Sequence, residues 1–86
     1  MAFDIKIKPL VLFDLEDRIK LYEHKTDGDG KRFYQTFLQG LSDLQHGVSD
    51  ETMPVYETIK KYVSKDARCS LFYTVAGNLI MVIGLL

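Results

Sequence analysis

The residues best suited to chemistry in this chain form a short cationic stretch. Lys60, Lys61, Lys65 and Arg68 lie within nine residues, and Asp66 is the only acid among them. Such a group of cations can bind an anion or a partner. A solvated strand edge and loop is the other reading, because lysine on an edge strand also prevents edge-to-edge aggregation. We take the four cations as candidate partner-binding or anion-binding residues.

Three other groups attract attention, and in each the spacing argues against chemistry. His24 and His46 lie 22 residues apart on different predicted helices, without a Cys or carboxylate at ligand spacing, so we expect no metal site. Cys69 has no His near it in the sequence, which favours a structural thiol. Residues 27–30, Asp-Gly-Asp-Gly, do not continue as a calcium loop, since Lys31 falls where an oxygen ligand is needed. The sequence therefore predicts no catalytic residue, no metal and no cofactor.

The first half of the chain predicts a strand followed by two helices. Residues 3–8 alternate apolar and charged side chains, as in a strand with one buried face. Apolar residues three and four apart then predict a helix from residue 10 to about residue 26. A turn at residues 27–30 leads into a second helix with His46 in its last turn, and the short connection favours an antiparallel helical hairpin. Gly40, inside the second helix, indicates a close approach of the first helix or is simply tolerated.

The second half predicts three strands after a polar loop at residues 48–54. The period changes from 3.6 to 2, and the strands are expected at 55–63, 69–75 and 79–86, the last two joined by a tight turn at 76–78. The last strand is apolar on both faces, so it should be interior to the sheet or covered on both sides. The predicted fold is α+β, a single βααβββ domain of 86 residues with the hairpin on one face of a small, mostly antiparallel sheet.

The opposite face of this sheet is expected to be both basic and apolar. If Leu71, Tyr73 and Val75 face the helices, strand alternation places Ser70, Phe72 and Thr74 on the open face together with Lys6 and Lys8. A face with Phe72 beside an apolar last strand is too hydrophobic to meet only solvent. We infer that a partner covers part of it, and Phe72 joins the four cations as a candidate site residue.

Composition narrows the classes of protein. The formal net charge is −1 and 47% of the residues are hydrophobic, so disordered and collagen-like chains are excluded, and bulk charge does not attract nucleic acid. The single cysteine and the absence of an apolar N-terminal stretch predict a cytoplasmic protein without a signal peptide. The longest apolar run has eight residues, against roughly 20 for a membrane helix, so we expect no membrane span.

Taken together, these segments resemble the RelE/ParE family of bacterial type II toxin–antitoxin toxins, also described as plasmid stabilization proteins. The resemblance covers nearly the full length. It rests on the order and spacing of residues 5–17, 19, 21–23, 30–34, 55–56, 59–60 and 70–75 and on the closing hydrophobic strand. It implies the same βααβββ fold and a cognate antitoxin, whose C-terminal segment lays an amphipathic helix, with a strand, onto the toxin.

The resemblance also bears on activity, because the family divides by target. The nuclease-like RelE branch places lysines and arginines on the open sheet face, with a tyrosine or histidine near the C-terminus, whereas the ParE branch lacks these groups and poisons DNA gyrase. Ser70 stands where nuclease-like members carry an arginine, and the chain stops at Leu86 before a C-terminal arginine or tyrosine. Losing one charge donor costs on the order of 10² to 10³ in rate, and losing a general acid or base about 10² to 10⁴.

We therefore expect a non-nucleolytic, ParE-like toxin that acts on a protein such as DNA gyrase. The net charge of −1 agrees, since a ribosome-binding nuclease needs a basic surplus for its phosphate contacts. One alternative is a divergent ribosome-dependent mRNA endonuclease that uses Lys60, Lys61 and Arg68. A second alternative is a degenerate family member that binds a partner without toxicity.

Overall fold

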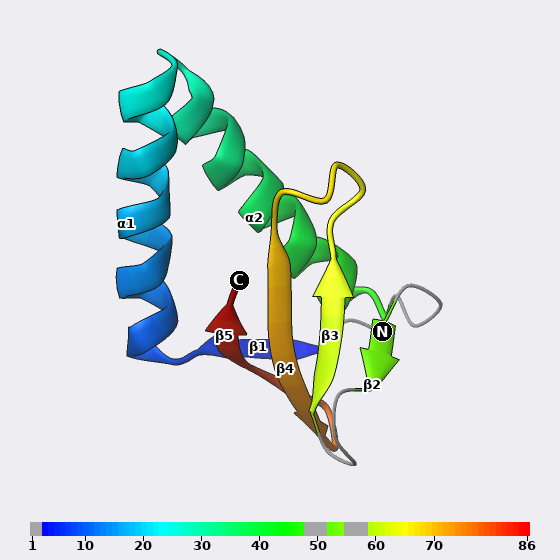
Figure 1. Cartoon of the computed structure of the whole chain (residues 1–86). Helices are drawn as coiled ribbons and strands as arrows, with labels where there is room; N and C mark the ends of the chain where they lie inside the picture. Colours follow the sequence, from blue (N-terminus) through cyan, green and yellow to red (C-terminus); the bar gives the residue numbers. More distant parts are fainter. Residues whose placement is uncertain (1–2, 48–51, 55–58) are drawn as a thin grey trace.

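A helical hairpin lies against one face of a five-stranded sheet in the computed structural model, which describes residues 3–47, 52–54 and 59–86 (Figure 1). In chain order the elements are β1 (Asp4–Ile7), α1 (Pro9–Lys25), α2 (Asp29–Gln45), β2 (Thr52–Pro54), β3 (Lys60–Val63), β4 (Ser70–Ala76) and β5 (Leu79–Leu85). The strands are ordered β1-β5-β4-β3-β2, with β1 parallel to β5 and every other pair antiparallel. This confirms the predicted α+β class, the mostly antiparallel sheet and the interior position of the last strand.

The turn between the two helices is closed by a carboxylate. Glu23 accepts hydrogen bonds from the backbone N–H of Gly28 and of Gly30, each at 3.1 Å, and Gly28 adopts a left-handed φ of 88°. At Gly30 the helices touch, because a Cβ there would lie 2.8 Å from the Ile19 carbonyl oxygen. The turn expected at residues 27–30 is shorter in the structure, since α2 already begins at Asp29.

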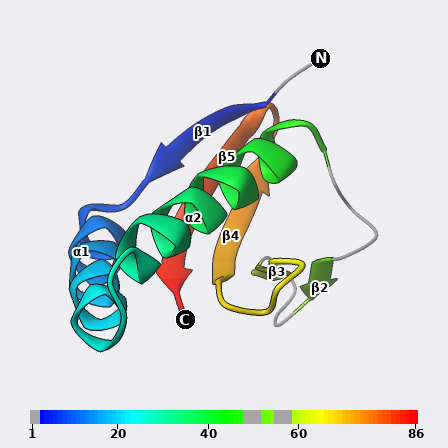
Figure 2. The ribbon, with the colours of Figure 1, turned by 90° about the horizontal axis from the view of Figure 1, so that it is seen from above.

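The second helix runs across the sheet, and the turn of the hairpin projects beyond the strands (Figures 1 and 2). A Cβ on Gly40 would lie 3.1 Å from Tyr62 Cε1 and 3.3 Å from Leu71 Cδ1. The close approach at Gly40 is therefore to the sheet, and the expectation of an approach by the first helix is wrong. Gly47, with φ of 80°, follows α2 as predicted.

The core lies between the hairpin and this face of the sheet. Leu71 and Tyr73 of β4 are buried there, as the alternation predicts, whereas Val75 is 42% exposed, so the expectation that it too is covered by the helices is wrong. The fully or nearly fully buried side chains are Val11, Leu15, Phe33, Phe37, Leu44, Tyr62, Cys69, Leu71, Tyr73, Ile80, Val82 and Leu85. Neither helix in the described part of the chain is long and apolar enough to cross a membrane.

The second half differs from prediction at its first strands. Thr52–Pro54 forms the edge strand β2 beside β3, although residues 48–54 were expected to be a loop. A strand of three residues is too short to show a period of two, so the pattern could not reveal it. The strand expected at 55–63 is present over Lys60–Val63, while residues 48–51 and 55–58 lie outside the described residues.

Candidate functional site

The adjacent residues Lys60 and Lys61 point to opposite faces of the sheet. Lys60 is aligned with Tyr73, whose side chain is in the core, and Lys61 is aligned with Phe72 on the open face. Aligned residues of an antiparallel pair share a face, and successive residues alternate. Only Lys61 among the four predicted cations is therefore brought together with Phe72.

Lys61 and Phe72 form the centre of the open face. The Lys61 ammonium lies 5.8 Å from the centre of the Phe72 ring, and the ring packs over Gly84, where a Cβ would lie 3.3 Å from Phe72 Cδ2. The pairing of β4 with β5 shifts register between Phe72 and Tyr73, so that Phe72 is aligned with Gly84. The face also carries Lys6, aligned with Met81, as predicted. Neither helix covers this face, since both lie on the other side of the sheet (Figure 2).

Lys65 and Arg68 lie in the loop between β3 and β4, on the helix side of the sheet. The Arg68 guanidinium lies over the Tyr22 ring, 5.8 Å from its centre, and 3.9 Å from Asp29. These contacts link the loop to both helices. The structure thus separates the predicted cationic stretch. Lys61 lies on the open face with Phe72, whereas Lys60, Lys65 and Arg68 lie on the helix side of the sheet.

A second carboxylate, Asp66, organises this loop. It accepts hydrogen bonds from the Ser64 hydroxyl at 2.7 Å, from the Arg68 backbone N–H at 3.1 Å and from the Thr36 hydroxyl of α2 at 3.3 Å. The Ser64 bond is the main cause of a lowered pKa at Asp66. Ala67 adopts a left-handed φ of 59°, which is unusual for a residue with a Cβ, and this tight bend brings the loop back into β4.

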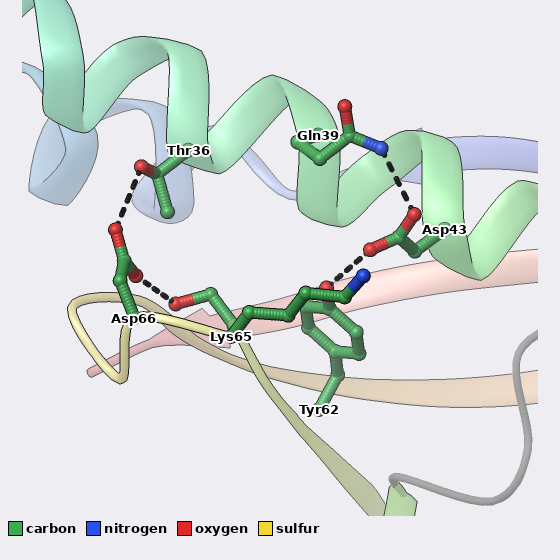
Figure 3. Close-up of a pocket in the computed structure, with 7 residues that line it drawn as sticks. Thr36, Gln39, Asp43, Tyr62, Lys65 and Asp66 are labelled. Atoms are coloured by element: carbon green, nitrogen blue, oxygen red, sulfur yellow. Dashed lines mark hydrogen bonds between the residues drawn. The ribbon is translucent and has the colours of Figure 1, made fainter.

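A pocket of about 220 Å³ opens between α2 and this loop (Figure 3). It is lined by Thr36, Gln39, Asp43, Tyr62, Ser64, Lys65 and Asp66. The hydroxyl of the buried Tyr62 donates to Asp43 and is the main cause of a lowered pKa of that carboxyl. The sequence analysis missed this pocket. Its only early signal was the spacing of Thr36, Gln39 and Asp43 on one face of a helix, which does not reveal the loop opposite.

A groove between α1 and the end of β5 is a second surface that the sequence analysis missed. It is lined by Asp14, Asp17, Arg18, Leu21 and Leu85 and encloses about 300 Å³. Leu21 is 52% exposed, and Leu10 and Phe13 on the same outward side of α1 are 70% and 67% exposed. The signal was present in the sequence, because α1 carries apolar residues outside its buried stripe.

Comparison with solved structures bears on the fold. No family model and no curated protein sequence matches the chain. Among solved structures, a chain of "Chromosomal ParDE TA system from P. aeruginosa" superposes with a TM-score of 0.82 and 13% sequence identity, over 98% of this chain and 94% of that chain. This chain has the fold of that ParDE structure. The RelE/ParE-like fold predicted from the sequence is confirmed, and at this identity the likeness concerns the fold alone.

Proposed function

We propose that this protein is the toxin of a type II toxin–antitoxin system, ParE-like and non-nucleolytic, and that it acts by binding a protein target such as DNA gyrase. The observation that carries the proposal is the superposition on a chain of a ParDE system over nearly the full length of both chains. An antitoxin is the partner that this proposal requires. A cytoplasmic location follows from it, because both the target and the antitoxin would be there.

The arrangement of cations supports the non-nucleolytic mode. Ser70, at the position where nuclease-like members carry an arginine, is half-buried and aligned with Val63. A nuclease using Lys60, Lys61 and Arg68 would need them around one phosphate, yet Lys60 and Arg68 lie on the opposite side of the sheet from Lys61. The separation of these cations favours a protein target over the alternative of an mRNA endonuclease.

The open face offers this protein target a recognition surface. Phe72 supplies an apolar ring and Lys61 a charge over it, and both residues are half-buried. A partner that presents an apolar side chain beside a carboxylate would match both groups.

We assign the antitoxin to the groove beside α1. Leu21 and Leu85 are the apolar residues of the groove lining, and its charged residues are Asp14, Asp17 and Arg18, with one more acid than base. An amphipathic antitoxin helix with an apolar stripe flanked by lysine or arginine fits this surface.

Co-expression tests the proposal. The chain is produced in a bacterial host alone and together with the protein encoded beside it. We expect growth arrest from the chain alone, and rescue with a stable complex when both are present. A chain that is harmless alone and has no neighbouring antitoxin gene contradicts the proposal. A complex that forms although neither gyrase nor translation is inhibited supports instead the degenerate partner-binding protein.

A further inference from the structure

The pocket between α2 and the β3–β4 loop has no part in the proposed toxin function. It is open to solvent on one side and measures about 220 Å³, below the roughly 300 to 1,000 Å³ of clefts that bind whole drug-sized molecules. A cavity of this size suits one small polar group. The chemistry of its walls determines which group that is.

The hydrogen-bond donors on the walls are directed at two carboxylates. The hydroxyls of Thr36 and Ser64 both donate to Asp66, at 3.3 Å and 2.7 Å. The Tyr62 hydroxyl and the Gln39 amide both donate to Asp43, at 2.5 Å and 3.0 Å. These bonds, drawn as dashed lines in Figure 3, orient both carboxylates and lower the pKa of each, which favours the ionised form. An ionised carboxylate offers about four acceptor positions, so Asp43, which accepts these two bonds, retains room for further donors.

A lysine of the chain itself extends along this pocket, which indicates that a cationic group fits there. Lys65 is exposed on the loop, and its side chain extends along the pocket toward Asp43 and Tyr62 (Figure 3). Its charge favours the ionised form of Asp43, although the two side chains form no ion pair within the described residues. A flexible lysine gives a point charge, whereas a planar guanidinium presents a fork of donors that matches carboxylate oxygens.

We propose that this pocket binds a guanidinium group, which hydrogen-bonds to Asp43 and displaces the Lys65 ammonium. The group belongs either to a small alkylguanidine or to an arginine side chain of a bound polypeptide. Both sources present the same donors to the same carboxylate.

The test is an NMR titration of the whole chain with N-ethylguanidinium chloride. We expect saturable shifts of the backbone amides of Thr36, Gln39 and Asp43, with a Kd on the order of 1 mM, as befits a ligand of six heavy atoms. The neutral isostere N-ethylurea and sodium chloride at matched ionic strength should give no saturation. Shifts that grow linearly, or that N-ethylurea reproduces, would overturn the proposal.

Two variants separate the pocket from general charge effects. Asp43→Asn keeps an acceptor for Tyr62 and removes the charge, and should weaken binding at least about tenfold. Lys65→Ala removes the competing cation and should strengthen binding several-fold. Glu16→Gln, which removes an exposed carboxylate on α1, is the matched control and should leave the Kd unchanged. An unchanged Kd in both pocket variants contradicts the assignment of the guanidinium to this pocket.

A second probe distinguishes the two sources. Binding of N-acetyl-arginine N-methylamide as tight as that of N-ethylguanidinium supports an arginine side chain of a polypeptide. Failure of the capped arginine, with N-ethylguanidinium still bound, supports a small alkylguanidine. Neither arm uses an antitoxin or gyrase, so the outcome is independent of the proposed toxin function.

Discussion

The Tyr62 hydroxyl donates a hydrogen bond to the Asp43 carboxylate and so connects β3 to α2 across the pocket. Its ring also packs against Gly40 of the same helix. Because Tyr62→Phe keeps the ring and loses the bond to a charged acceptor, we expect the free energy of unfolding to fall by about 1 to 2 kcal/mol. Urea denaturation measures this change. Tyr34→Phe, at an exposed tyrosine of α2, is the control and should change it by less than about 0.5 kcal/mol.

Acid should weaken the attachment of the loop to α2. The pKa values of Asp43 and Asp66 are lowered, mainly by the hydrogen bonds from Tyr62 and Ser64 respectively, from an ordinary value of 3.8. A lowered pKa in the folded state contributes stability that is present above 3.8 and is lost as the pH falls through the folded value. Unfolding free energies between pH 6 and pH 2 should therefore decline more steeply in the parent chain than in Asp43→Asn. Equal dependence of the unfolding free energy on pH in the two chains would contradict a lowered pKa of Asp43 in the folded protein.

The Cys69 thiol should be unreactive in the folded protein. Its side chain is buried, and burial raises its pKa from 9.0 to about 11. At pH 8 we expect iodoacetamide to label the native chain far more slowly than the chain in urea, as followed by mass spectrometry. Because the unfolded thiol ionises first, the contribution of Cys69 to stability is present below pH 9 and is lost as the pH rises toward 11. Equal labelling of native and unfolded chains would show that the thiol is accessible.

The open face should be the part of the surface that acts on the target. Lys61→Ala and Phe72→Ala remove the charge and the ring that meet there, and each should abolish growth arrest in the expression assay while the circular dichroism spectrum is unchanged. Lys60→Ala is a matched control, because this lysine belongs to the same strand but the opposite face. If Lys60→Ala were as harmful as Lys61→Ala, the open face would not be the site.

The fold was predictable from local pattern because each main element is long enough to show its period. Apolar side chains recur every three or four positions over residues 9–25 and 29–45. The strand at 79–85 is apolar on both faces, as its place between β1 and β4 requires. The exception is Thr52–Pro54, whose three residues carry no period and pair only through β3. The strand expected at 55–63 is described only from Lys60, and the boundaries of the other helices and strands lie within two residues of expectation.

The candidate site was predicted less well, and the reason is geometric. Lys60 and Lys61 are neighbours in sequence, but the alternation of a strand sends them to opposite faces, so a run of cations does not become a cluster. The pocket has the converse problem. Asp43 and Tyr62 are 19 residues apart and come together only when β3 packs under α2, which no spacing rule reveals.

DNA supercoiling by purified gyrase in the presence of this protein tests the proposed function most directly. We expect supercoiling to be inhibited in proportion to added protein, and mRNA in a coupled translation reaction to stay intact. Addition of the cognate antitoxin should restore supercoiling. Undisturbed supercoiling together with ribosome-dependent cleavage of the mRNA would rule out a gyrase-directed toxin and establish the endonuclease instead.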